Sequence, residues 1–476
     1  MQSIVDAMLA EFCRDPRAAL DRRPPKHDRD GRELARESLF SPLDIRRGRH
    51  ITGRDPIRHS LTRLEHGVLT RLGDLVPGDR VADLVDRLEH RSLAAMEDAE
   101  LRAAELTESP WSDDYWPVYL GGIGQRYADP KFPLAADWTK NYAYIQNHPV
   151  RDLFASGDQT AISRLSPAEK YDLLVGDPHM GLTTSSWAEG RMHHDQRGEV
   201  EVWLGISHGW ASASVALPRP LHAVDTRTAD GSRLRFFPAD IKALASLLWA
   251  HNATLSRFAG GSNSNNSSDP QRGTHAMGIN PDTFHLALVN QLGVARRSFI
   301  IDATHDYEIW NQPLQAYRYA YFNPQTLRSA STLADARVPI AAFDRDHFSG
   351  QRGPDTAAVV GVMMEVTYVR ESIPIHNMDS ASRDPLRTVR YLYDLELDRA
   401  DDIIGGEWYT HKHPDFLWSP AAGARAHTPA DTVIQGTWAS DEPVPGSWRG
   451  LAWHSSATAA SPLAVIVEAL INRARR

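Results

Sequence analysis

The stretch Gly205-Ile206-Ser207-His208-Gly209-Trp210-Ala211 carries the strongest fold signal in the chain. It follows an apolar, strand-prone run at 202–204 and precedes a segment without helix breakers that ends at Pro218. Because glycine permits a tight backbone and proline ends a helix, the pattern predicts a strand, a tight turn and a short helix over 208–217. Ser207 then lies at the helix N-terminus, where unpaired N–H groups and the helix dipole can hold negative charge. The alternative interpretation is that Ser207 only caps the helix, because serine is a favoured cap residue.

Two strand-like runs, 283–290 and 298–303, follow further along the chain. A type II′ turn centred on Gly293-Val294 would join them as a hairpin, since glycine supplies the positive φ. In that register His285 lies opposite Asp302, with Cβ atoms about 4.5–5.5 Å apart. A carboxylate at this distance can orient an imidazole. We therefore expect Ser207, His285 and Asp302 to form one site. The alternative is that His285 is a core residue and Asp302 a turn former.

Five separated blocks add to this constellation. They are Pro110-Trp111-Ser112 with Tyr115-Trp116-Pro117, Leu165 to Asp172, Trp310 to Pro313, Ile404 to Trp408, and His413 to Trp418. These blocks, and the order of nucleophile, His and Asp, resemble the elicitor-type transglutaminases, a family of transglutaminase-like cysteine enzymes. The resemblance covers the chain from about residue 109 to about residue 420.

The resemblance assigns a role to each candidate. His285 matches the family's general base and Asp302 its orienting carboxylate, whereas Ser207 stands where the family has cysteine. We place Trp203, His208 and Trp210 at the oxyanion site and substrate cleft, with Trp203 assisting the backbone N–H of residue 207. The alternative for the two tryptophans is an ordinary place in the core, and we favour it for Trp210.

The reaction that the resemblance implies is acyl transfer from a glutamine-containing protein or another acyl donor to an amine, without a cofactor. A thiol has a reference pKa near 8.5, whereas an aliphatic hydroxyl must lose its proton during attack. Serine at position 207 therefore predicts an inactive or impaired site. Serine at this position has three possible explanations: an engineered substitution, a natural serine nucleophile, or a natural degenerate site in a binding protein. The alternative functions are an amide synthase that uses a carrier-bound thioester in a biosynthetic pathway, and a non-catalytic binding protein.

We expect an α+β fold with a transglutaminase/papain-like core. Helical periodicity from Leu61 to Leu72 and from Leu93 to Leu106 predicts an α-helical N-terminal region, residues 1–108, which is either a packed accessory domain or a pro-segment. The catalytic core follows at 109–345. Apolar and alternating runs at 359–370 and 388–397 predict a β-rich C-terminal domain at 346–476, closed by an amphipathic helix over 462–476.

Composition limits the partners. The chain has 476 residues and a formal net charge of −9, so neither nucleic acid nor an anionic membrane is an expected partner. The single cysteine, Cys13, excludes a disulfide framework and lies in a predicted amphipathic helix far from the motifs, so we do not expect it to be the nucleophile. No metal site is expected, because His193-His194-Asp195 and His411-Lys412-His413 are typical of surface loops.

The N-terminus lacks the basic and apolar pattern of a secretory signal, which predicts a cytoplasmic protein. A secreted mature form without its signal is the alternative.

Overall fold

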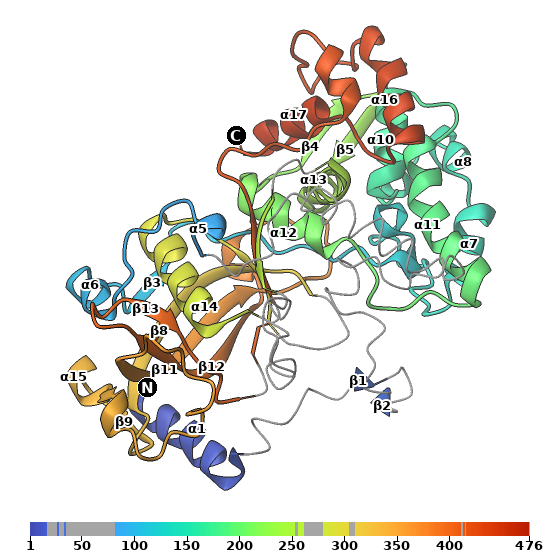
Figure 1. Ribbon diagram of the computed structural model, residues 1–476. Helices are drawn as coiled ribbons and strands as arrows, with labels where there is room; N and C mark the ends of the chain where they lie inside the picture. Colours follow the sequence, from blue (N-terminus) through green and yellow to red (C-terminus); the bar gives the residue numbers. More distant parts are fainter. Residues whose placement is uncertain are drawn as a thin grey trace.

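The computed structural model describes residues 1–16, 26–27, 33–34, 81–252, 256–260, 279–303, 310–410, 413–414 and 416–475. Figure 1 shows two parts side by side, one built on a β-sheet and one built mainly of helices. Helix α12 (Ser207–Ala216) lies between them and packs against α13 (Pro238–Asn252). The candidate site therefore lies where the two parts meet.

The sheet runs in the order β13-β12-β11-β8-β7-β14-β6, and β3, β9 and β10 pair with β8 or β11. Its described pairings are all antiparallel. The strands are β3 (Ala103–Glu105), β6 (Ser256–Gly260), β7 (Ile300–Asp302), β8 (Gln312–Asn323), β9 (Arg328–Ala330), β10 (Arg337–Pro339), β11 (Ala358–Val369), β12 (Leu386–Leu397), β13 (Ile403–Gly405) and β14 (Phe416–Pro420). Two short hairpins stand apart: β1 (Lys26–His27) with β2 (Glu33–Leu34), and β4 (Val224–Arg227) with β5 (Arg233–Phe236).

Helices cover both faces of the sheet. Side chains alternate along a strand, so neighbouring residues of β11 face opposite sides. Val362 and Met364 pack in one cluster with α14 (Pro281–Leu288), whereas Met363 packs in another with α1 (Gln2–Arg14). Central strand β11 is therefore buried along nearly its whole length, which its almost continuous apolar sequence indicated.

Short helices complete the sheet-bearing part: α5 (Val81–Leu84), α6 (Leu93–Asp98) and α15 (Leu333–Ala336). Helix α14 continues as a π-helical turn over Val289–Val294. The helical part contains α7 (Trp138–Asn147), α8 (Val150–Ala155), α9 (Gln159–Ser163), α10 (Pro167–Val175), α11 (Gly181–Arg197), α16 (Gly446–Thr458) and α17 (Ala464–Ala474), besides α12 and α13.

The start and stop of α10 follow from its sequence. Ser166 accepts a hydrogen bond from the N–H of Glu169, and the Glu169 side chain accepts one from the N–H of Ser166, which forms a capping box. Pro167 occupies the first turn, and Gly176 ends the helix in the left-handed conformation. Glu169 also binds the buried Arg126, so the same carboxylate caps the helix and neutralises a buried charge.

The last two helices return to the helical part. Trp448 and Ala452 of α16 and Ile466 and Leu470 of α17 belong to the same core as the buried residues of α13. The predicted closing helix is confirmed as α17. The predicted strands at 359–370 and 388–397 are confirmed as β11 and β12.

The two helices that matter for the site cover opposite faces of the sheet. Ala211 of α12 packs in one cluster with Ile300 and Trp418, whereas Phe284 of α14 packs in another cluster with Ile301. Because Ile300 and Ile301 are neighbours on β7, their side chains point to opposite sides. The sheet therefore separates α12 from α14.

This arrangement corrects the predicted hairpin. Residues 281–288 form helix α14 and not a strand, and no turn centred on Gly293 joins them to β7. A short apolar run does not distinguish a strand from a buried helix. The helix signals were local: Asn280 occupies the N-cap, Pro281 the first turn, and Asp282 supplies an acidic residue there.

Other boundaries also differ from expectation. The helix predicted from Leu93 ends at Asp98 and is followed by β3, while the periodic residues Leu61 to Leu72 lie outside the described residues. The strand predicted at 202–204 is wrong: residues 202 and 203 form a turn. The proposed boundary between 345 and 346 falls between β8 and β11, which pair with each other in one sheet, so the division into domains stays a prediction.

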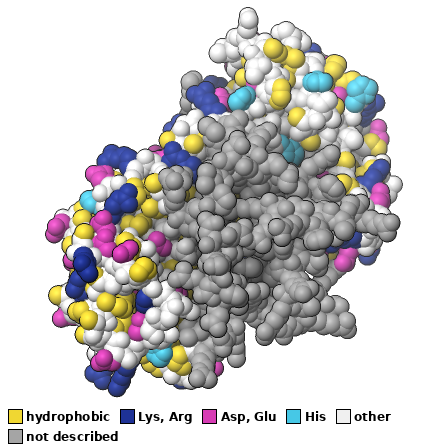
Figure 2. Space-filling view, viewed as in Figure 1, with side chains coloured by type: hydrophobic (Ala, Val, Ile, Leu, Met, Phe, Trp, Pro, Cys, Tyr) yellow, Lys and Arg dark blue, Asp and Glu magenta, His cyan; other side chains and the backbone are white. Residues whose placement is uncertain are grey.

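The surface carries charged side chains of both signs (Figure 2), in agreement with the numbers of basic and acidic residues in the sequence. In the view of Figure 2, basic and acidic side chains are interspersed over the sheet-bearing part. Among the described helices, none is long and apolar enough to cross a membrane.

Candidate active site

Ser207 is the first residue of α12, one position earlier than the predicted helix start. The N–H groups of Gly209 and Trp210 donate to the carbonyl of Ile206, so the Ser207 hydroxyl does not cap the helix and the capping interpretation is wrong. Among the described residues, the backbone N–H groups of Ser207 and His208 have no acceptor. The first turn therefore presents two N–H groups beside the Ser207 side chain, in the region of a helix that favours negative charge.

Close backbone contacts hold this turn in place. Ile206 donates its N–H to the carbonyl of Tyr115 at 2.7 Å, and a Cβ on Gly205 would lie 2.4 Å from that carbonyl oxygen. A Cβ on Gly209 would lie 2.2 Å from the carbonyl oxygen of Ser246 on α13. Both glycines thus permit approaches that any side chain would prevent.

The side chain of Asn311 contacts Ser207. Its Nδ2 donates to Ser207 Oγ at 3.1 Å, and its Oδ1 accepts from Nε1 of Trp418 at 3.0 Å. All three side chains are buried. Asn311 and Trp418 come from two of the resemblance blocks, and sequence reasoning assigned neither of them a chemical role.

Asp302 lies on the same side of the sheet. Ile300 pairs with Pro313 and Ile301 with Gln312, so the next step of the register sets Asp302 opposite Asn311. Residues opposite each other share a face. Asp302 is buried at the end of β7 and also pairs with Phe416 on β14. The structure thus brings Ser207, Asn311 and Asp302 to the face that α12 covers.

His285 lies on the other face. Its Nδ1 hydrogen-bonds the hydroxyl of Tyr393 at 2.8 Å, and its ring packs edge-on against Tyr319. Its Nε2 has no hydrogen-bond partner among the described residues. The predicted hydrogen bonds from His285 to Asp302 and Ser207 are therefore wrong in this structure, because residue 285 belongs to a helix on the far side of the sheet. Burial lowers the pKa of His285 to about 3, so the ring is neutral at physiological pH.

We expect His285 to stabilise the core without assisting residue 207. The change His285→Gln should lower the free energy of unfolding by about 1–3 kcal/mol, because it removes the buried imidazole that hydrogen-bonds the Tyr393 hydroxyl and packs against Tyr319. In a Ser207→Cys background it should leave the alkylation rate of the new thiol unchanged. Thermal melts and iodoacetamide kinetics measure the two effects. Slower alkylation at full stability would restore His285 as the base.

The three residues expected in the cleft differ in their surroundings. Trp210 is fully buried and donates to the carbonyl of Trp111 at 2.9 Å, so it belongs to the core and not to a cleft. Trp203 packs against the cluster that contains Trp138 and Trp187, and its oxyanion role stays a prediction. Burial and the nearby His251 lower the pKa of His208 to about 4, which keeps this ring neutral beside the helix start.

A group of acidic side chains borders the turn, and the sequence did not single it out. Burial raises the pKa of Asp113 to about 7, and burial together with the charge of Asp113 raises that of Asp114 to about 8. The following residue, Tyr115, packs its ring against Trp310 with centroids 5.3 Å apart. Glu371 accepts a hydrogen bond from Gln312, the neighbour of Asn311. In the sequence, Asp113 and Asp114 lie between the two halves of the first resemblance block, whereas Glu371 lies in none of the five blocks.

Comparison with known proteins agrees with this resemblance. A family model described as transglutaminase elicitor matches residues 86–437. The chain belongs to the transglutaminase elicitor family. The family assignment predicted from five blocks is thereby confirmed, and the mixed helix and sheet architecture agrees with the expected α+β class.

One solved structure is similar to this family member. The crystal structure of the GP42 transglutaminase from Phytophthora sojae aligns at 19% sequence identity, over 83% of this chain and 98% of that chain, with a TM-score of 0.48. A search of curated proteins gives no match.

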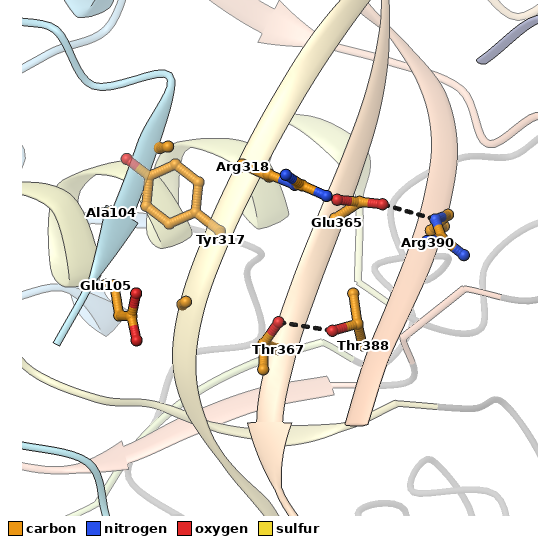
Figure 3. Close-up of a pocket in the computed structure, with 10 residues that line it drawn as sticks. Ala104, Glu105, Tyr317, Arg318, Glu365, Thr367, Thr388 and Arg390 are labelled. Atoms are coloured by element: carbon orange, nitrogen blue, oxygen red, sulfur yellow. Dashed lines mark hydrogen bonds and ion pairs between the residues drawn. The ribbon is translucent and has the colours of Figure 1, made fainter. Parts of the chain in front are cut away.

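A polar groove of about 400 Å³ lies elsewhere on the sheet of this elicitor-family chain, beside the region that α1 covers. Figure 3 shows Glu365 between Arg318 and Arg390, with Thr367 and Thr388 in the next row. Burial opposes ionisation of Glu365, but its hydrogen bonds to Arg318 and Arg390 lower its pKa. The groove is thus accounted for by cross-strand charge pairing. Among the described residues there is no cluster of three potential metal ligands.

The raised pKa of Asp113 predicts a pH dependence of stability. Asp113 is buried, and its folded-state pKa of about 7 lies above the ordinary value of 3.8. The stability that depends on its protonation is therefore fully present below about pH 4 and is lost as the pH rises to about 7. Asp113→Asn keeps an oxygen to accept from Trp116 but cannot ionise. The melting temperature of this variant minus that of the parent should increase from pH 4 to pH 7 and then level off.

The exposed carboxylate of Asp195 provides the matched control. Asp195→Asn removes the same formal charge at the surface, so the melting-temperature difference of this variant at each pH reports the effect of a surface charge. A pH-independent difference for Asp113→Asn would mean that Asp113 is ionised over the whole range from pH 4 to pH 7.

Proposed function

We propose that this chain carries a transglutaminase-type acyl-transfer site at residue 207, impaired in its present form because serine stands at the nucleophile position. The observation that carries the proposal is the surroundings of Ser207 Oγ. It lies at the start of α12, beside backbone N–H groups without acceptors among the described residues, and accepts a hydrogen bond from Asn311. Membership of the transglutaminase elicitor family supports the reaction class.

The chemistry explains why the side chain at residue 207 matters. In a cysteine form, the thiolate sulfur would attack a carboxamide carbon, the C–N bond would break, and ammonia would leave with a proton. An amine would then attack the thioester carbon, form the new C–N bond, lose one proton to water and release the thiolate. A hydroxyl needs a base during attack, and no described histidine hydrogen-bonds Ser207. We therefore assign the impairment to the oxygen at residue 207.

The substrates we propose are a glutamine-containing protein as acyl donor and a primary amine, such as a lysine side chain, as acceptor. The test is incorporation of a fluorescent primary amine into dimethylated casein by the Ser207→Cys variant. We expect transfer by the variant and little or none by the serine form. Absence of transfer by a folded variant with a reactive thiol would contradict the acyltransferase and favour a non-catalytic binding protein.

A further inference from the structure

The amide of Asn311 has one orientation that satisfies both of its neighbours. An indole N–H only donates hydrogen bonds, so the group that faces Trp418 must be the amide oxygen. The NH₂ group of Asn311 then faces Ser207 and donates to its Oγ. The assignment of oxygen and nitrogen thus follows from the chemistry of the tryptophan.

The surroundings strengthen this hydrogen bond. Asn311 is 6% exposed, Trp418 2% and Ser207 7%, so water competes little for the donor. Hydrogen bonds to an ionised acceptor are about twice as strong as those between neutral groups. A negative charge on the side-chain atom of residue 207 would therefore gain more from Asn311 than the neutral hydroxyl does.

We propose that Asn311 is the side-chain donor that stabilises negative charge on the reacting atom at position 207, and that Trp418 is the positioning residue that fixes its amide. This inference rests on the proposed function only in taking residue 207 as the reacting position. The sheet supports it, because Trp418 and Ile300 are paired neighbours and both pack against α12. The donor thus lies directly before β8 and is fixed by Trp418 of β14, while the acceptor is held on the helix.

The experiment measures how the rate of iodoacetamide alkylation at residue 207 depends on pH, in full-length Ser207→Cys protein. The thiolate is the reacting form, so the midpoint of the profile reports the pKa of the thiol. Three second-site changes are compared in this background: Asn311→Ala removes the donor, Asn311→Asp replaces it with an isosteric acceptor, and Trp418→Phe removes the indole N–H. Alkylation at residue 207 is followed by peptide mass spectrometry.

We expect Asn311→Ala to raise the midpoint by about one unit, which lowers the rate below the midpoint about tenfold. Asn311→Asp should raise it further, because the new carboxylate repels a thiolate. Trp418→Phe should give a smaller rise, since the amide loses its fixed orientation. Superimposable profiles for the folded Asn311→Asp variant and its parent would overturn the proposal.

Asn252 offers a matched control. It is also a buried asparagine whose Nδ2 donates to a serine hydroxyl, that of Ser461 at 2.7 Å, but it ends α13 and its hydrogen bonds go to Leu248 and Ser461, not to residue 207. Asn252→Ala should lower the melting temperature without moving the midpoint. A midpoint that moves equally in this variant would mean that loss of packing, and not loss of the donor, causes the shift.

The role proposed for Asn311 and the acyl-transfer function are contradicted by different results. Alkylation requires only a thiolate, whereas amine incorporation requires a substrate and the whole reaction. A midpoint that depends on Asn311 without amine incorporation would support the role of Asn311 and contradict the acyltransferase. Amine incorporation together with superimposable alkylation profiles would support the acyltransferase and contradict the role of Asn311.

Discussion

Ser207→Cys should create a thiol that iodoacetamide alkylates at pH 7 at least about tenfold faster than a thiol of ordinary pKa. Thiol pKa values at helix N-termini fall to about 3.5–7.5, against a reference near 8.5. A thiol with a pKa of about 6.5 is mostly thiolate at pH 7, whereas the reference thiol is only a few per cent thiolate. The N–H groups at the start of α12 and the Asn311 amide supply the stabilisation. Rates at each cysteine are measured by peptide mass spectrometry.

Two controls separate this electrostatic effect from differences in the access of iodoacetamide to the thiol. Cys13 is exposed, so it reports alkylation without a barrier to the reagent. Ser214→Cys sets a thiol in the same helix at similar burial, since Ser214 is 5% exposed and Ser207 is 7% exposed. Residue 214 lies beyond the first turn and should react far more slowly than residue 207. Equal rates at the two positions would show that the helix start does not activate the site.

Gly209→Ala should destabilise the protein strongly, by about 3 kcal/mol or more, because it forces apart two packed helices in a tightly filled core. The new Cβ would lie 2.2 Å from the carbonyl oxygen of Ser246 and 2.6 Å from the Cβ of Ala250. A backbone carbonyl cannot rotate away as a side chain can. Moving α13 would also displace residue 207, so in the Ser207→Cys background the alkylation rate at that position should fall together with the melting temperature.

Gly450→Ala is the matched control for this change. Gly450 lies within α16, and a Cβ there would meet no atom within 4 Å. Alanine is favoured over glycine in a helix by about 0.5–1 kcal/mol, so this variant should be neutral or slightly more stable than the parent. The same substitution is thus expected to destabilise the protein at Gly209 and not at Gly450. Similar small effects at both would mean that α12 and α13 are less closely packed than the distances indicate.

The parts of the fold that were predicted correctly depend on neighbouring residues. The tight turn at Gly205 and the proline at 218 define the short helix that begins at Ser207. The alternation from Thr388 to Leu397 predicted β12, and the apolar run from Val359 predicted β11. The strand predicted over residues 283–290 is wrong, because a short buried apolar run fits either period, whereas Asn280 at the N-cap and Pro281 in the first turn indicate a helix.

The order of residues along the chain was enough to predict the family, because family membership is a property of local sequence blocks, whereas the assignment of Ser207 to the nucleophile position stays a prediction. Which side chains contact Ser207 became known only from the packed chain. Asn311 is 104 residues from Ser207, and Trp418 is 107 residues from Asn311, so their contacts depend on strand register and on the face that α12 covers. His285 stands closer in sequence but lies across the sheet, because a helix and not a strand carries it. Local patterns specify helices and strands, whereas the packing of those elements determines which residues share a site.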